Sequence, residues 1–273
     1  MNISERSTVN SVRNTYLQLG LNPPKELADA LARLDKLNER ARQLGALPAG
    51  DDLGNAVSAA LLDDRDPAGD YDVQRILAAQ ALAAHHGLPD AVTAAAVDGI
   101  RNACATHLDD IVNDWRAPFD RAAADLAAAY QRIGNLDLDD TTTILAKGGD
   151  IAEVWATART AAGTIDTVLN GWHALMMLMN VTLDPRHRAL RLAALGLEQY
   201  RSLPAKTSAW DLLRSGVTLN LPSLDEYRRR IANIEREQAD ETAAGLNVAR
   251  DRSKTIDVEW VRRVDAARAA TVQ

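Results

Sequence analysis

Cysteine and aromatic residues are scarce in this chain. Its 273 residues include one Cys, one Phe, five Tyr and five Trp. A single cysteine excludes a disulfide within the chain. Cys104 falls on an apolar stripe, where a free cysteine behaves as a small buried hydrophobic residue. We therefore expect Cys104 to belong to the core, and we expect Ala and small aliphatic residues to fill most of the interior.

Residue patterns that bind metals or phosphates are also lacking. The five histidines include no pair spaced i, i+4, and there is no second cysteine to join them as a metal ligand. Gly148 and Gly149 lack the lysine of a phosphate-binding loop and follow no predicted strand. The sequence therefore predicts no bound metal and no cofactor.

Long apolar runs and an excess of positive charge are missing as well. The most apolar window, residues 172–183, is too short and too interrupted to span a bilayer, and the polar N-terminus lacks the apolar stretch of a signal peptide. The net charge is −7, which disfavours general nucleic-acid binding and binding to anionic membranes. We expect a cytoplasmic protein, or one incorporated into a particle assembled there, with no membrane contact and no nucleic-acid partner.

The residues that are abundant favour helices. Strong helix formers such as Ala, Leu, Arg and Glu dominate, and β-branched residues do not alternate along any stretch. With 47% apolar residues, the chain can bury a sizeable core. The sequence therefore predicts an all-α fold.

The longest regular pattern covers residues 97–133, where apolar residues recur in steps of three, four and four. Its members are Val97, Ile100, Cys104, Leu108, Ile111, Trp115, Phe119, Ala122, Leu126, Tyr130 and Ile133. Eleven residues in three turns is about 3.67 residues per turn, so the stripe runs almost straight along a helix. Such a helix would be roughly 55 Å long. Pro118 lies inside it and predicts either a bend in one helix or two helices stacked end to end.

A second long helix is predicted over residues 151–179, where apolar residues follow a heptad pattern. Trp155, Ala162, Leu169 and Met176 widen its apolar stripe, and a wide stripe packs against two neighbours. We expect an elongated multi-helix bundle built on a long antiparallel helical hairpin, with a third helix on the broad face. The expected parts are N-terminal helices with an acidic connector (1–72), the hairpin core (73–182), and C-terminal helices packed on the hairpin (183–273).

Shorter elements are predicted around this hairpin. Residues 45–72 form the acidic, solvated connector, with one short helix near 53–62. Further helices are expected over 184–200 and 204–215. Ser223 and Glu226 form a capping-box pattern that predicts a polar helix ending near residue 244. A last short helix is expected over 257–270.

One motif on the long apolar pattern could carry chemistry. Arg101 and His107 are separated by five residues, and Asn102 follows the arginine. This spacing resembles the Arg-x4-6-His signature of HEPN-family ribonucleases, which are all-helical. The resemblance implies that Arg101 and His107 of two protomers meet in a dimer cleft and cleave RNA; a histidine can act as acid or base, and an arginine can hold a phosphate. On a continuous helix, however, the two side chains would lie about 120° apart, so the alternative is two solvated residues beside the stripe.

A second motif is rich in aspartate. Asp109, Asp110, Asn113 and Asp114 resemble the magnesium-diphosphate motif of class I isoprenoid synthases, which are also all-α, and carboxylates suit Mg²⁺. The chain offers no second motif of this kind and few aromatic residues to shelter a carbocation. We therefore prefer the interpretation that these residues form the wet face of the helix.

The preferred functional hypothesis is a non-enzymatic structural or assembly component, as in a phage-like or other multi-subunit particle. Long regular helices, Ala-rich packing and the lack of a catalytic set favour it. The expected partner is another protein or a second copy of the chain, bound through helical faces to give an oligomer. The alternative hypothesis is a HEPN-like ribonuclease that acts as a dimer through Arg101 and His107.

Overall fold

The computed structural model describes residues 3–45, 50–84, 88–204 and 206–244 of the chain. Within these ranges all regular secondary structure is helical, so the all-α prediction is confirmed. Each helix in this part of the chain is too short or too polar to cross a bilayer.

Helices follow one another closely along the chain. The N-terminal helices are α1 (Ile3–Leu19), α2 (Lys25–Gly45), α3 (Gly50–Leu62), α4 (Tyr71–Ala84) and α5 (Leu88–Thr106). The central helices are α6 (Leu108–Ile133), α7 (Thr141–Ala146) and α8 (Gly149–Leu178). The C-terminal elements are the 3-10 turns η1 (Pro185–His187) and η2 (Ala189–Arg191), then α9 (Leu197–Ser202), α10 (Ala209–Arg214) and a helix over 224–244.

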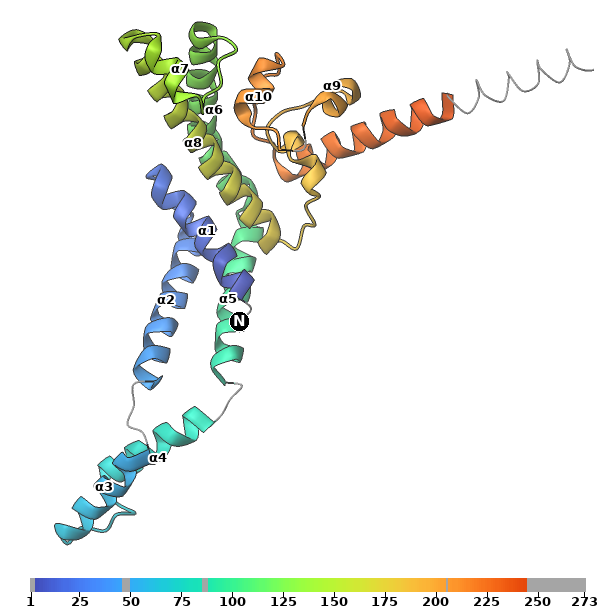
Figure 1. Cartoon of the computed structure of the whole chain (residues 1–273). Helices are drawn as coiled ribbons and strands as arrows, with labels where there is room; N and C mark the ends of the chain where they lie inside the picture. The colour runs from blue at the N-terminus through green and yellow to red at the C-terminus, as the bar shows by residue number, and fades with distance from the viewer. Residues whose placement is uncertain (1–2, 46–49, 85–87, 205, 245–273) are drawn as a thin grey trace, which may run out of the picture.

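The two longest helices form the centre of the molecule. The chain reverses through residues 134–148, and α8 then runs back beside α6 (Figure 1). Trp115 and Phe119 of α6 and Ile165 and Trp172 of α8 are fully buried, as their positions on the two apolar stripes predict. Helix α1 also packs on α8. The wide apolar stripe of α8 therefore packs against two helices, α6 and α1.

Of the two predicted arrangements, residues 97–133 form two consecutive helices, α5 and α6, and these meet at His107 rather than at Pro118. The backbone there leaves helical geometry, with φ −111° and ψ 25°. The His107 N–H still donates to the Ala103 carbonyl at 3.1 Å, and the His107 carbonyl accepts from the Ile111 N–H at 2.9 Å. Because this backbone bonding continues, the apolar stripe keeps its register through the junction. The interruption lies at His107, whereas Pro118 is buried inside α6.

The C-terminal elements attach to α6 and α8 through two tryptophans. The Trp172 indole N–H donates to the Pro222 carbonyl at 3.1 Å, and its ring meets Tyr227 edge-on with 5.1 Å between centroids. Trp210 of α10 donates to the Leu136 carbonyl at 2.9 Å. These contacts join chain segments that lie 50 and 74 residues apart in sequence.

The single helix predicted over 184–200 is wrong. Residues 185–191 form the turns η1 and η2, and α9 begins only at Leu197. Donors from later parts of the chain bind carbonyl groups that would accept hydrogen bonds within a longer helix. The Asn220 N–H donates to the Leu192 carbonyl at 2.7 Å, and the Arg230 guanidinium donates to the Leu190 carbonyl at 2.9 Å. Tertiary hydrogen bonds thus replace the local ones.

Helices α3 and α4 form a hairpin at one end of the molecule (bottom of Figure 1). They pack against each other, and α4 also contacts α2. Among the described side chains of this hairpin, the buried hydrophobic residues are Ala60, Val73 and Ile76, and they lie outside the large hydrophobic cluster. The hairpin therefore has a small core of its own.

Candidate functional site

Arg101 ties α5 to two other helices. Its Nε donates to the Leu178 carbonyl at the C-terminal end of α8, at 3.0 Å. Its guanidinium also pairs with Asp98 and lies 3.8 Å from a carboxylate oxygen of Glu5 on α1. A cation near the end of a helix interacts favourably with the carbonyls there. These contacts assign Arg101 to holding helices together.

His107 lies between two carboxylates at the junction of α5 and α6. Its Nδ1 is 3.0 Å from Asp110, and its Nε2 is 3.0 Å from Glu26 of α2. The side chain is partly buried. Both ring nitrogens of His107 therefore face a carboxylate of the same chain.

The structure does not bring Arg101 and His107 together within one chain. Arg101 contacts α1 and α8, whereas His107 contacts α2, and within the described residues no partner is common to both. The continuous helix on which their 120° separation was predicted is absent, because α5 ends at Thr106.

The aspartate-rich motif at the start of α6 is divided between structural contacts. Asp110 pairs with His107, and Asp114 accepts a hydrogen bond from the Tyr16 hydroxyl of α1 at 3.2 Å. In the part of the chain that the structure describes, no three His, Cys, Asp or Glu side chains are grouped so that they could hold a metal ion. These carboxylates therefore fix helices α1 and α6 to each other and orient His107.

Cys104 and His173 are among the titratable groups whose pKa the surroundings shift. Cys104 is fully buried, and burial raises the pKa of its thiol to about 12. Burial, reinforced by the charge of Arg191, lowers the pKa of His173. The His173 Nδ1 lies 3.2 Å from an Arg191 nitrogen and accepts from it in the neutral form. Neither group has the environment of a reactive nucleophile or base.

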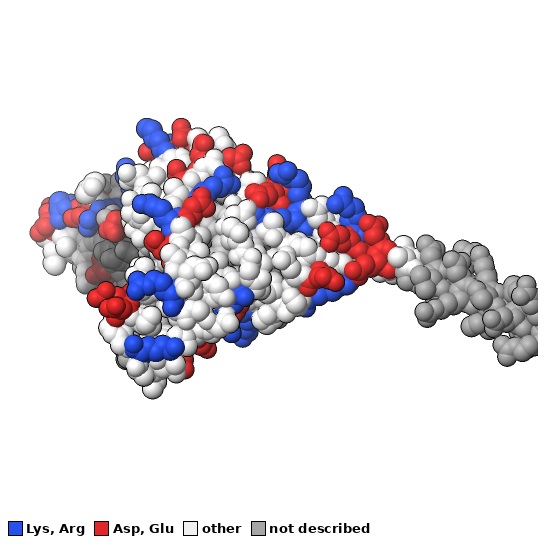
Figure 2. All heavy atoms as spheres, turned by 90° about the horizontal axis from the view of Figure 1, so that it is seen from above, with Lys and Arg blue, Asp and Glu red and all other residues white. Residues whose placement is uncertain are grey.

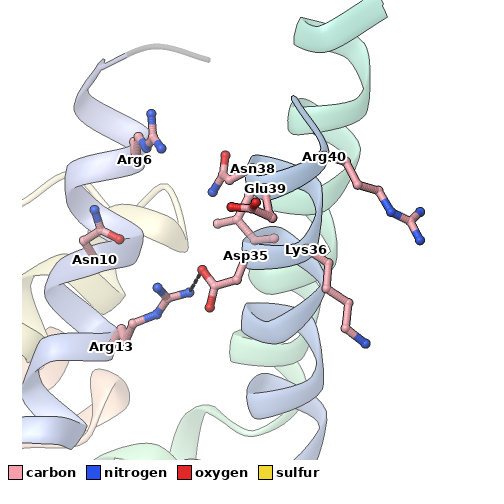
Figure 3. A pocket seen from close by; sticks show the side chains of 9 residues that line it. Arg6, Asn10, Arg13, Asp35, Lys36, Asn38, Glu39 and Arg40 are labelled. Atoms are coloured by element: carbon pink, nitrogen blue, oxygen red, sulfur yellow. Dashed lines mark hydrogen bonds and ion pairs between the residues drawn. The ribbon is translucent and has the colours of Figure 1, made fainter. Parts of the chain in front are cut away.

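A hollow of about 670 Å³ lies between α1 and α2 (Figure 3). Arg6 and Arg13 of α1 line one side of it, and Arg13 pairs with Asp35 of α2 at 2.9 Å. Lys36 and Arg40 point away from α1 (Figure 3). The basic side chains therefore do not converge on one point, as the recognition of a phosphate would require.

Charges of both signs lie on the face of the molecule that is seen from above (Figure 2). Seen from above, basic and acidic side chains are interspersed around an uncharged centre (Figure 2). Acidic side chains gather toward the last described turns of the helix over 224–244 (Figure 2). This face has mixed charge, which is typical of a solvated protein surface.

The turn between α3 and α4 carries exposed apolar side chains. We call Leu61, Leu62 and Tyr71, which flank this turn, the hairpin tip. They are 62%, 87% and 77% exposed. Leu77 of α4 is also about half exposed, so four of the six large exposed hydrophobic residues in the described part of the chain lie on one small hairpin. Exposed apolar side chains are therefore concentrated on this hairpin.

The hairpin is also strongly acidic. Residues 50–84 contain seven Asp and two Arg, a net charge of −5. Arg65 pairs with Asp63 at 2.9 Å and with the buried Asp70, and this closes the turn. Other carboxylates, among them Asp64 and Asp66, stay exposed beside the tip. The tip thus combines apolar side chains with negative charge.

The sequence predicts a solvated connector here and does not predict the exposed apolar tip. Its Asp content pointed to solvent, and the short helix predicted near 53–62 is present as α3. The available signal was the pair Leu61–Leu62 at the end of that helix, next to Tyr71 after the turn. Whether such residues face a core or solvent depends on what packs on the hairpin, which local sequence does not specify.

Comparisons with family models, curated proteins and solved structures gave no match to this chain. A function for the protein must therefore be argued from its own residues and their arrangement.

Proposed function

We propose that this protein is a non-enzymatic helical component of a multi-subunit assembly, and that it acts by contact with a protein partner or a second copy. The observation that carries the proposal is the hairpin tip. Its three large apolar side chains are exposed, and the α3–α4 hairpin that carries them lies at one end of the molecule (Figure 1). Proteins that work as monomers rarely leave such a group uncovered.

The low stability expected for the α3–α4 hairpin alone supports the binding of a partner to it. Isolated helices shorter than about 12–15 residues are marginal in water, and α3 and α4 have 13 and 14 residues. Three buried residues give this hairpin little hydrophobic stabilisation of its own. Covering one exposed leucine side chain contributes about 1.5–3 kcal/mol. A partner on the tip would therefore add stability where the chain supplies least.

The chemistry of the remaining candidates also supports a role without catalysis. Arg101 and His107 are engaged by neighbouring helices, and Cys104 is buried with a raised thiol pKa. An assembly component needs shape and surface more than it needs such groups. A phage-like or other multi-subunit particle, built in the cytoplasm, is the kind of assembly we propose.

Mass measurement tests this proposal. Light scattering on the purified full chain, and on complexes recovered from source cells, should give a mass above that of a 29.6 kDa monomer. The Leu62→Asp variant should lose the added mass. Leu17→Asp is the matched control, because Leu17 is 70% exposed on α1, away from the tip. A protein that stays monomeric and partnerless in both settings would contradict the proposal.

A further inference from the structure

We infer that the hairpin tip binds the C-terminal segment, residues 245–273, of a second copy of this chain. The inference rests on the proposed function and names the partner at the same surface. The resulting contact is head-to-tail: the tip of one copy meets the tail of the next.

The chemistry of the tip selects the kind of partner. Leu61, Leu62 and Tyr71 offer apolar contacts, and the hairpin around them has a net charge of −5. An amphipathic helix with basic residues fits both properties, because its apolar face covers the leucines while its cations meet the aspartates. A second hairpin tip is a poor partner, because two surfaces of like charge repel each other.

The chain itself contains a segment of this chemistry. Residues 257–270, predicted from sequence to be helical, lie outside the described residues. On a helix, Trp260 and Val264 would be spaced i, i+4 and Val261 and Val264 i, i+3, so that Val264 neighbours both. Across residues 245–273 there are six Lys and Arg against four Asp and Glu, a net charge of +2. This part of the chain is thus opposite in charge to the hairpin.

The arrangement of the fold favours a contact between copies. The helix over 224–244, which leads to this segment, lies at the opposite end of the molecule from α3 and α4 (Figure 1). A tail that starts at one end reaches a tip at the other end most readily on a neighbouring molecule. Two different surfaces meet in such a contact, so it repeats from copy to copy and builds chains or rings.

Complementary variants of the full chain test the inference. Leu62→Asp disables the tip and leaves the tail intact, whereas Arg262→Glu/Arg263→Glu disables the tail and leaves the tip intact. Sedimentation velocity of the wild type should show a mass that grows with concentration. Each variant alone should associate about tenfold or more weakly, and Leu17→Asp should behave as the wild type. Helicity from circular dichroism checks that each variant is folded.

Mixing the two variants gives the decisive result. Each supplies the surface that the other lacks, so an equimolar mixture should form one-to-one dimers and nothing larger. A fluorescent peptide of residues 245–273 should bind the tail variant, bind the tip variant about tenfold more weakly, and lose affinity as salt is raised.

Three outcomes would overturn the inference. A wild type that associates while the mixture stays monomeric would place the interface elsewhere, and the proposed function would stand. A wild type that is monomeric alone but binds a different protein would also overturn it and leave the proposed function intact. Peptide binding that is equal for both variants would show that the tip is not the binding surface.

Discussion

The side chain of Thr15 on α1 occupies the space that a side chain at Gly171 on α8 would need. A Cβ atom built at Gly171 would lie 2.3 Å from the Thr15 Oγ1 and 2.8 Å from its Cβ. Thr15 is buried, and its hydroxyl donates to the Ser11 carbonyl at 2.9 Å. Glycine at 171 therefore allows α1 to approach α8.

Gly171→Ala should destabilise the protein by about 1–3 kcal/mol, because the added methyl group pushes α1 away from α8. Gly163→Ala on the same helix is the control. That position has no atom within 4 Å of the added Cβ, so alanine there should stabilise by about 0.5–1 kcal/mol. Urea unfolding of both variants measures the difference, and equal effects would contradict the close approach.

Arg230→Ala should destabilise by about 2–3 kcal/mol, because the Leu190 carbonyl and the Glu226 carboxylate lose the hydrogen bonds that the buried guanidinium donates. The side chain is only 5% exposed, and these bonds are 2.9 and 2.5 Å long. Arg228→Ala provides the comparison, since its 3.6 Å pair with Asp225 is exposed and is worth little. Thermal unfolding should separate the two variants by several degrees; matching midpoints would argue against a structural role for Arg230.

Acidification should weaken the packing of His173. Its pKa is lowered in the folded protein, so the unfolded chain takes up this proton first. The free energy of unfolding should therefore fall as the pH drops below about 6.5, the ordinary value for histidine. His173→Gln cannot titrate there, so its urea midpoint should fall less than that of the wild type between pH 7.5 and 5.5. An identical fall would show that His173 does not contribute.

The Cys104 thiol should resist modification until the protein unfolds. It is fully buried, and its pKa is raised from 9.0 to about 12. The unfolded chain ionises first as the pH rises, so this group should remove up to about 1.4 kcal/mol of stability per pH unit above pH 9. Comparison with Cys104→Ala isolates that effect. Rapid labelling of the native protein at pH 8 would contradict the burial of this residue.

RNA cleavage tests the alternative hypothesis directly. If the protein acts by contact alone, neither the wild type nor His107→Ala should cleave RNA. The variant should still lose stability, because Glu26 and Asp110 lose the side chain between them. Cleavage by the wild type that disappears in His107→Ala, with helicity unchanged, would support the HEPN-like ribonuclease instead.

Periodicity was sufficient to predict the long helices and their buried faces. Trp115, Phe119, Ile165 and Trp172 all lie where a 3.6-residue period places them. The junction at His107 could not be predicted in the same way, because backbone bonding and the apolar register both continue across it. A proline was the expected point of interruption, yet Pro118 is accommodated inside α6.

Contacts between distant segments set the limits of prediction elsewhere. Residues 184–200 have helical composition, but Asn220 and Arg230 bind the carbonyls that a helix would need. Glu26 and Asp110 reach His107 from two helices, which no spacing within one motif reveals. The sequence therefore predicts Arg101 and His107 as a motif, but it does not predict the contact between His107 and Glu26 of α2.

The separate core of the α3–α4 hairpin implies that this protein does not unfold as one cooperative unit. Among the described side chains, Ala60, Val73 and Ile76 lie outside the large cluster, so we expect the hairpin to open locally while α6 and α8 stay folded. Its amide protons should then exchange with solvent faster than those of the central helices. Binding of a partner to the hairpin tip would stabilise the folded hairpin. The ordering of this short hairpin would therefore indicate that the contact with the partner has formed.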